Sequence, residues 1–284
     1  MLPLNLLNSG MFSHNYEDAR IALFGAPFDG TASFRPGARF APQAIRSEFF
    51  GLEPYSPYQD KVIADAAAFD CGDLELPFGN AARALSIIES FVESLLADEK
   101  LPFMLGGEHL VSLGAVRALL KKYPDMRVIQ FDAHADLLDE YMGEKLSHAA
   151  VMRRIWELTG DGKIFQFGIR SGKRHEFEFA MQHTNMRKFD FMGLDLAVES
   201  LSAVPVYVSV DLDALDPSVL PGTGTPEAGG VAFQELLNAI LQLSPLNIVG
   251  CDINELAPVY DPSGVSTAVA CKVLREMALL VSKA

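Results

Sequence analysis

The sequence has few cysteines, a deficit of positive charge and no long apolar run. Its 284 residues include three cysteines, which are scattered and form no CxxC pair. This argues against a disulfide framework or a thiolate metal site, and it fits a reducing cytoplasm. Asp and Glu (37) outnumber Lys and Arg (23), so the formal net charge is −14. Such a charge argues against nucleic acids and anionic membranes as partners and favours cationic ligands.

Targeting and membrane signals are also missing. Residues 1–8 lack a basic region and a long apolar segment, so a signal peptide is not expected. No apolar run approaches the roughly 20 residues that a membrane helix needs. Hydrophobic residues make up 49% of the chain, and no internal repeat, linker or low-complexity tract is visible. We therefore expect residues 1–284 to form a single domain with one large core.

Strand-like and helix-like patterns alternate along most of the chain. After an irregular lead-in over 1–18, strands are expected at 20–26, 62–69, 101–105, 128–131, 163–168, 205–210 and 246–251. Helices are expected at 41–50, 80–96, 109–122, 147–156, 173–183, 233–243 and 266–282, whereas 185–203 is ambiguous. This alternation predicts an α/β fold, in which a parallel sheet carries helices on both faces.

A cluster of metal-ligand residues follows the expected strand at 128–131. Asp132, His134 and Asp136 occupy alternate positions, and alternate side chains of an extended backbone point to the same side. Two carboxylates and an imidazole brought together in this way are costly unless a cation lies among them. Mostly oxygen ligands with some nitrogen suit manganese or a similar divalent ion.

Three further segments with ligand residues also follow expected strands. His109, the pair Asp211 and Asp213, and Glu255 each come just after an apolar run. Because ligands of open α/β sheets bind at the carboxyl ends of the strands, these segments are expected to meet. Together with residues 132–136 they supply more carboxylates than one divalent ion needs. Two metal ions that share bridging carboxylates can activate a water molecule and polarise the atom it attacks.

These motifs resemble those of the ureohydrolase family, which includes arginase and agmatinase. The matching stretches are Gly106–His109, Asp132–Asp136, Ser209–Pro217 and Asp252–Pro258, together with the loops Phe28–Arg39 and Pro221–Gly230. The two loops are more similar to agmatinase than to arginase, and the resemblance extends over roughly residues 20–280. Several long motifs in a fixed order make it specific.

The resemblance implies a three-layer α/β/α sandwich with a mainly parallel sheet of about eight strands. It also implies a cytoplasmic homo-oligomer, a trimer or hexamer, that hydrolyses agmatine to putrescine and urea with two Mn²⁺ ions per subunit. One ion would be held by His109, Asp132, Asp136 and Asp211, and the other by Asp132, His134, Asp211 and Asp213, with Asp132 and Asp211 bridging.

Catalytic roles follow from the same resemblance for His148, Glu255 and Asp136. Glu255 would bind the planar guanidinium through paired, charge-assisted hydrogen bonds, which a carboxylate is suited to accept. His148 would carry a proton to the departing amine. It follows Ser147, a plausible N-cap, and a helix N-terminus disfavours a cationic imidazole. The alternatives are that His148 is a surface histidine at a helix start and that Glu255 simply caps or pairs with an arginine.

Two positions depart from the family pattern, and several functions stay open. Leu110 stands where the family usually has serine, and Asn254 occupies a commonly apolar position. The acidic residues of loop 137–148 suit a cationic substrate tail. Other guanidino or amidino hydrolases (arginase, guanidinobutyrase, formimidoylglutamase) remain alternatives, as does a non-catalytic binding subunit, which the six retained ligand residues argue against. A zinc deacetylase of related fold typically has adjacent paired histidines, and the sequence has none.

Overall fold

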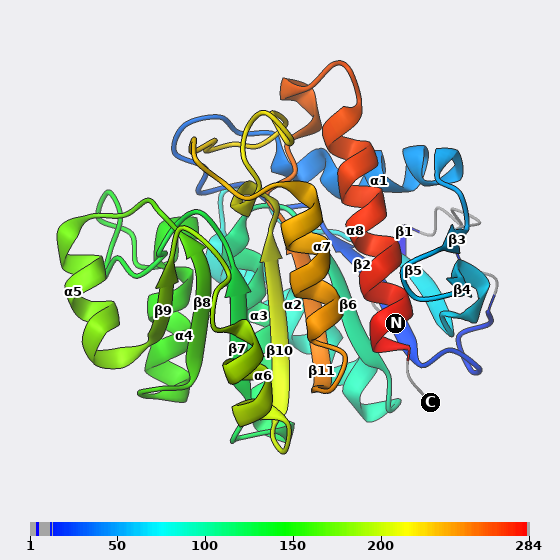
Figure 1. Ribbon diagram of the computed structural model, residues 1–284, viewed down its shortest axis with the longest axis horizontal. Coiled ribbons are helices and arrows are strands. Elements are labelled where there is room, and N and C mark those ends of the chain that lie inside the picture. The colour runs from blue at the N-terminus through cyan, green and yellow to red at the C-terminus, as the bar shows by residue number, and fades with distance from the viewer. Residues whose placement is uncertain (1–3, 6–11, 13, 283–284) are drawn as a thin grey trace.

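A nine-stranded sheet forms the middle of the molecule (Figure 1). The computed structural model describes residues 4–5, 12 and 14–282. In spatial order the strands are β1 (Leu4–Asn5), β5 (Ala68–Leu74), β2 (Ile21–Ala26), β6 (Leu101–Gly106), β11 (Asn247–Asn254), β10 (Pro205–Asp211), β7 (Arg127–Phe131), β8 (Ile164–Ile169) and β9 (Asn185–Lys188). Strands β5 to β9 in this order pair in parallel, and only β1 is antiparallel, to β5.

Helices cover both faces of the sheet, each over its own buried core. One face is covered by α1 (Ala41–Glu48), α6 (Leu194–Leu201), α7 (Phe233–Gln242) and α8 (Val265–Val281). The other is covered by α2 (Ala81–Ala97), α3 (Ser112–Lys122), α4 (Val151–Thr159) and α5 (Arg174–His183). The predicted three-layer sandwich with eight parallel strands is confirmed. No helix in the described part of the chain is long and apolar enough to cross a membrane.

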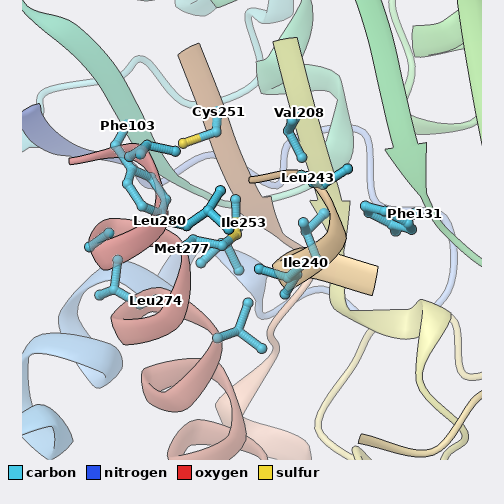
Figure 2. Close-up of a cluster of buried hydrophobic side chains, with 14 of the residues drawn as sticks. Phe103, Phe131, Val208, Ile240, Leu243, Cys251, Ile253, Leu274, Met277 and Leu280 are labelled. Atoms are coloured by element: carbon cyan, nitrogen blue, oxygen red, sulfur yellow. The ribbon is translucent and has the colours of Figure 1, made fainter. Parts of the chain in front are cut away.

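The core under α7 and α8 shows why the central strands are apolar on one side (Figure 2). Cys251 and Ile253 of β11 point into this core, where they meet Leu274, Met277 and other side chains of α8. Burying each large apolar side chain stabilises the fold by about 1.5–3 kcal/mol. Because side chains alternate along a strand, the next residue after each of them, Asp252 and Asn254, faces the opposite side of the sheet.

The prediction of a strand at 62–69 is wrong, because the sheet strand of this region begins later, at Ala68. Residues 55–62 form a small hairpin, β3 (Tyr55–Ser56) with β4 (Lys61–Val62), and a 3₁₀ turn follows. The sheet strand β5 lies later in the chain, at Ala68–Leu74, and includes Asp70 and Asp73. Arg46 of α1 explains this, because its guanidinium binds Asp70 through Nε (2.8 Å) and Nη2 (2.9 Å) and also contacts Asp73. With this partner the two carboxylates are tolerated inside the fold.

Smaller differences occur elsewhere. The ambiguous segment 185–203 forms strand β9 and helix α6. Within the lead-in 1–18, the structure has the short strand β1, and residues 1–3, 6–11 and 13 lie outside the described residues. Strand β11 continues to Asn254, beyond the predicted end at residue 251. Its two additional polar residues, Asp252 and Asn254, are buried and hydrogen-bonded to each other. An apolar run in the sequence does not predict such a pair.

Candidate active site

The predicted ligand segments meet at the carboxyl edge of four adjacent strands. His109 begins the 3₁₀ turn η4 (His109–Val111) after β6, and Asp132 directly follows β7. Asp211 ends β10, and Glu255 comes immediately after β11. Since β6, β11, β10 and β7 are neighbours in the sheet, residues up to 146 positions apart in sequence come into contact, as His109 and Glu255 do.

The imidazole of His109 lies among three carboxylates. Its Nδ1 is 2.9 Å from Asp132 Oδ2, 3.1 Å from Asp136 Oδ2 and 3.2 Å from Asp211 Oδ2. Ligand atoms held about 2.1 Å from one ion at right angles lie roughly 3 Å apart. None of the three oxygens is aligned for a hydrogen bond with Nδ1, which is buried without a hydrogen-bond partner. The arrangement therefore suits a cation shared by these four groups.

A second group of ligand atoms adjoins the first. His134 Nδ1 is 3.0 Å from Asp213 Oδ2 and 3.6 Å from Asp132 Oδ1. Asp132 thus belongs to both groups, with one oxygen toward each imidazole. Asp211 has one oxygen toward His109, and its Oδ1 accepts the backbone N–H of Asp213 at 2.9 Å. Asp132 therefore lies between the two groups of ligand atoms. A bridging role for Asp211 stays a prediction.

The charges of the cluster are balanced poorly by the protein alone. Burial, with the nearby charge of Asp132, raises the pKa of Asp136 to about 7. Burial and the carboxylate of Asp213 raise the pKa of Asp211 well above its usual value. Burial would also raise the pKa of Asp132, but the imidazoles of His109 and His134 beside it outweigh burial and lower that pKa. Divalent cations among these groups would keep every carboxylate ionised, so the cluster could hold metal.

A cavity of about 300 Å³ opens onto the cluster. Its walls include the cluster residues His109, His134, Asp136, Asp211 and Asp213, the predicted catalytic residues His148 and Glu255, and Leu138, Tyr141, Lys173 and Glu176. The acidic residues of loop 137–148 do not line it. Asp139 is exposed and binds Arg154 at 3.0 Å, while Glu140 and Glu144 are exposed. The predicted contribution of this loop to a cationic subsite therefore finds no support in the cavity walls.

Glu255 occupies a strained backbone position beside the cluster. Its φ is +65°, which is uncommon for a residue other than glycine and typical of functional sites. Its Oε1 accepts the backbone N–H of His109 at 2.7 Å. Burial, together with the carboxylates of Glu108 and Asp213, raises its pKa well above the usual value. Within the described residues Oε2 accepts no hydrogen bond, so this oxygen is available to a ligand in the cavity.

His148 lines the same cavity, from the turn that precedes α4. It begins the 3₁₀ turn η5 (His148–Ala150), whose N-cap Ser147 accepts the N–H of Ala149 at 3.3 Å. Burial of the ring is the largest cause that lowers the pKa of His148 to about 4, and the imidazoles of His134 and His109 add to it. The ring is therefore neutral near pH 7, and burial rather than the expected helix N-terminus is the main cause. Its role as proton carrier stays a prediction.

Comparison with known proteins agrees with this geometry. Residues 19–280 match the model of the arginase family. The chain belongs to the arginase family. The agmatinase of Halalkalibacterium halodurans is 49% identical over 95% of this chain and 94% of its own length. A crystal structure of a Clostridium difficile protein, proposed to be an agmatinase, superimposes with a TM-score of 0.92 at 50% identity, covering 94% and 99% of the two chains. The agmatine ureohydrolase of Thermoplasma volcanium superimposes at 0.86 with 36% identity, covering 99% and 95%.

In this arginase-family chain a buried serine determines which nitrogen of His109 carries a proton. Ser209 Oγ donates its one proton to Asp252 Oδ1 at 2.6 Å, and it lies 2.9 Å from His109 Nε2. The hydroxyl can therefore only accept from this nitrogen, so Nε2 is protonated and Nδ1 keeps its lone pair. That lone pair points into the carboxylate cluster. Metal-binding histidines are generally oriented by such a hydrogen bond on the other ring nitrogen.

Ser209 is part of a row of buried polar residues that the sequence did not reveal. Gln166, Gln130, Ser209 and Asp252 occupy matching register positions on β8, β7, β10 and β11, and all are fully buried. Gln166 Nε2 donates to Gln130 Oε1 at 2.7 Å, and Gln130 Nε2 donates to Asp132 Oδ2 at 2.6 Å. The available signal was the spacing, because Gln130 and Ser209 each precede a cluster carboxylate by two residues.

The two departures from the family pattern have different surroundings. Leu110 is fully buried in the apolar core under α2 and α3. Asn254 donates from Nδ2 to Asp252 Oδ1 at 2.8 Å and to Ser112 Oγ at 3.0 Å. Its Oδ1 lies where a Cβ on Gly106 would approach within 1.7 Å, so glycine at 106 makes room for the amide. Asn254 thus extends the polar row toward α3.

Proposed function

We propose that this chain hydrolyses the guanidinium group of agmatine to give putrescine and urea. Membership of the arginase family supports a hydrolase of guanidino C–N bonds, and the similarity to agmatinases favours agmatine over arginine, guanidinobutyrate and formimino compounds. The observation that carries the proposal is the joint position of the carboxylate cluster, the free oxygen of Glu255 and the neutral ring of His148 around one cavity. Residues 1–284 would act as a single catalytic domain.

Two divalent ions fit the donor set. Four carboxylates and two imidazoles converge, and the lone pair of His109 Nδ1 is fixed by Ser209. The first ion would be held by His109, Asp132, Asp136 and Asp211, and the second by Asp132, His134, Asp211 and Asp213. Oxygen-rich ligation of this kind favours manganese. When bound, such a metal pair supplies a nucleophilic water at neutral pH and stabilises developing negative charge.

The chain's own residues would bind the substrate and move its proton. Glu255 Oε2 would accept an N–H of the guanidinium, and the paired charges would fix the orientation of the planar group. His148, neutral near pH 7, would accept a proton from solvent at its ring and deliver it to the amine nitrogen as the C–N bond breaks, because the amine leaves poorly without a proton.

A substrate panel tests the proposal directly. Purified protein with added Mn²⁺ is assayed for urea release from agmatine, arginine and 4-guanidinobutyrate, and metal content is measured by elemental analysis. We expect agmatine to have the highest kcat/KM and the protein to bind two ions per chain. Glu255→Gln, which keeps the size of the side chain, should greatly weaken turnover and retain both ions. Absence of urea from all three compounds, or no more than one ion per chain, would overturn the proposal.

We also propose that the chain works as a homo-oligomer, a trimer or hexamer, in the cytoplasm. Apolar side chains that are exposed near β9 and α6, with Met192 at 68% and Leu196 at 67% exposure, support association of subunits. The three cysteines are free and buried, which is compatible with a reducing compartment. Light scattering coupled to gel filtration measures the mass, and a monomer at micromolar concentration would contradict the assembly.

A further inference from the structure

The loop Phe28–Arg39, which the sequence singled out and the proposed mechanism does not use, reaches the catalytic histidine. Thr31 of this loop lies between His148 and Glu108. Its Oγ1 donates to Glu108 Oε1 at 2.6 Å, and its backbone N–H donates to Glu108 Oε2 at 2.9 Å. The same Oγ1 accepts the backbone N–H of His148 at 3.0 Å and lies 3.4 Å from the ring Nδ1. One hydroxyl therefore connects a buried carboxylate to the imidazole.

While the Glu108 carboxyl is ionised, the hydroxyl proton of Thr31 determines which ring nitrogen of a neutral His148 carries the proton. A threonine hydroxyl has one proton and two lone pairs. The proton is directed to Glu108, so the two lone pairs are left for the backbone N–H and the ring Nδ1 of His148. Ring Nδ1 can approach this oxygen only as a donor. A neutral His148 then carries its proton on Nδ1 and exposes the lone pair of Nε2, which lies 3.2 Å from Ser33 Oγ in the cavity wall.

The contact is anchored by the fold at both ends. Glu108 is 1% exposed, and its backbone N–H donates to Phe28 O at 2.7 Å, which ties the residue to the start of the loop. A Cβ at position 107 would approach that oxygen within 1.9 Å, so glycine permits this close packing. Asp29 accepts the N–H of Gly37 at 2.7 Å and fixes the far end of the loop. The loop therefore presents Thr31 rigidly.

We propose that Thr31 and Glu108 are positioning residues that hold the imidazole of His148 in its Nδ1–H tautomer, with Nε2 directed into the cavity. The inference rests on the proposed function, because it concerns the proton carried by His148. Thr31 does not line the cavity, so it acts through His148 and not on the substrate. Nε2 is then the atom that accepts and delivers the proton, and no ring rotation is needed before each turnover.

Several other side chains surround the ring of His148, and they are the same residues in every Thr31 variant. The ring of Tyr141 packs against His148 edge-on at 5.8 Å between centroids. The charged or titratable groups that act on the histidine from the remaining elements are His109, His134 and Asp213 across the cavity, with Glu108 behind Thr31. A substitution at Thr31 changes the identity of none of these residues.

The test compares Thr31→Val, which keeps the shape and removes the hydroxyl, with Thr31→Ser, which keeps the hydroxyl. Urea release is measured over a range of pH with Mn²⁺, alone and in a His148→Ala background. We expect Thr31→Val to lower kcat about 10–100-fold, as loss of one hydrogen bond to an ionisable group allows, with KM within about twofold. Thr31→Ser should restore most of kcat and the wild-type pH profile. In the His148→Ala background, Thr31→Val should have no further effect.

Thr223→Val is the matched control, because Thr223 is 1% exposed and its Oγ1 has no hydrogen-bond partner in the described structure. This variant should behave as wild type. Metal content and thermal unfolding are measured for each protein, and Thr31→Ala replaces Thr31→Val if the latter does not fold. Wild-type kcat in Thr31→Val, or an equal loss in the His148→Ala background, would overturn the positioning role. Absence of urea from the wild-type protein would instead remove the proposed function.

Discussion

Ser209→Ala is the substitution that most directly probes how the buried polar row supports the metal site. The change removes one oxygen atom from a fully buried position and creates almost no cavity. It leaves His109 Nε2–H without its acceptor at 2.9 Å and takes from Asp252 Oδ1 a donor at 2.6 Å. A buried group that loses its partner costs about 1–3 kcal/mol.

The loss should appear mainly as weaker metal binding. Without Ser209, the ring of His109 can tilt or change its tautomer in the metal-free protein, and a bound ion must reverse this. Residues that orient a metal ligand typically contribute 10–100-fold to affinity, which equals about 1.4–2.8 kcal/mol. This agrees with the cost of the orphaned hydrogen bond. We therefore expect the Mn²⁺ concentration that gives half-maximal urea release to rise about 10–100-fold, with kcat at saturating Mn²⁺ reduced less.

The assay titrates Mn²⁺ into chelator-treated protein and follows urea release together with bound metal. Ser56→Ala serves as the control, because Ser56 is also fully buried and donates to Glu276 Oε2 at 2.7 Å, remote from the cluster. This control should lower the free energy of unfolding by a similar amount and leave metal affinity unchanged. If Ser209→Ala binds Mn²⁺ as wild type does, or if both variants weaken binding equally, the reasoning about the tautomer of His109 is refuted.

Four further predictions concern other groups. Asp132→Asn should remove both ions, because this carboxylate faces both imidazoles, and Asp211→Asn should abolish turnover; near-normal urea release from the latter would end its bridging role. His148→Ala should slow turnover and retain both ions, and an unchanged rate at every pH would contradict the proton transfer. Burial raises the pKa of Cys71 and Cys271 from 9.0 to about 12, so the free energy of unfolding should fall as the pH rises from 9 towards about 12. Chemical unfolding at several pH values, with both cysteines replaced by alanine as comparison, measures this change.

The sequence predicted well those features that depend on neighbours along the chain. The position of Asp132, His134 and Asp136 after an apolar run placed them at the edge of the sheet. The extended backbone assumed for their alternate spacing does not hold, because β7 ends at Phe131 and Asp136 has a φ of +55°. The alternation of strands and helices was enough for the three-layer architecture. The residues of each ligand segment are close together in the chain. The segment can therefore be recognised without knowing which strands lie beside it.

What the sequence did not predict depends on which strands are neighbours. The polar row exists because β8, β7, β10 and β11 are adjacent, an order unrelated to their order in the chain. Gln166 alone reads as an interruption of an apolar strand. The start of β5 was misplaced for a similar reason, since Asp70 is accommodated by Arg46 from a separate helix. Partners supplied by distant segments turn apparent turn residues into strand residues.

The arrangement of the row also explains why ligands and their supports are coupled in the fold. Asp132, directly after β7, and Asp211, the last residue of β10, each follow by two residues a polar residue of the row, Gln130 and Ser209. Since positions i and i+2 share a face, any shift of strand register that moved a ligand would move its neighbour in the row as well. Such a shift would leave buried amide and hydroxyl groups unpaired, at about 1–3 kcal/mol each. The hydrogen bonds that orient the ligands therefore also fix the register in which the ligands meet.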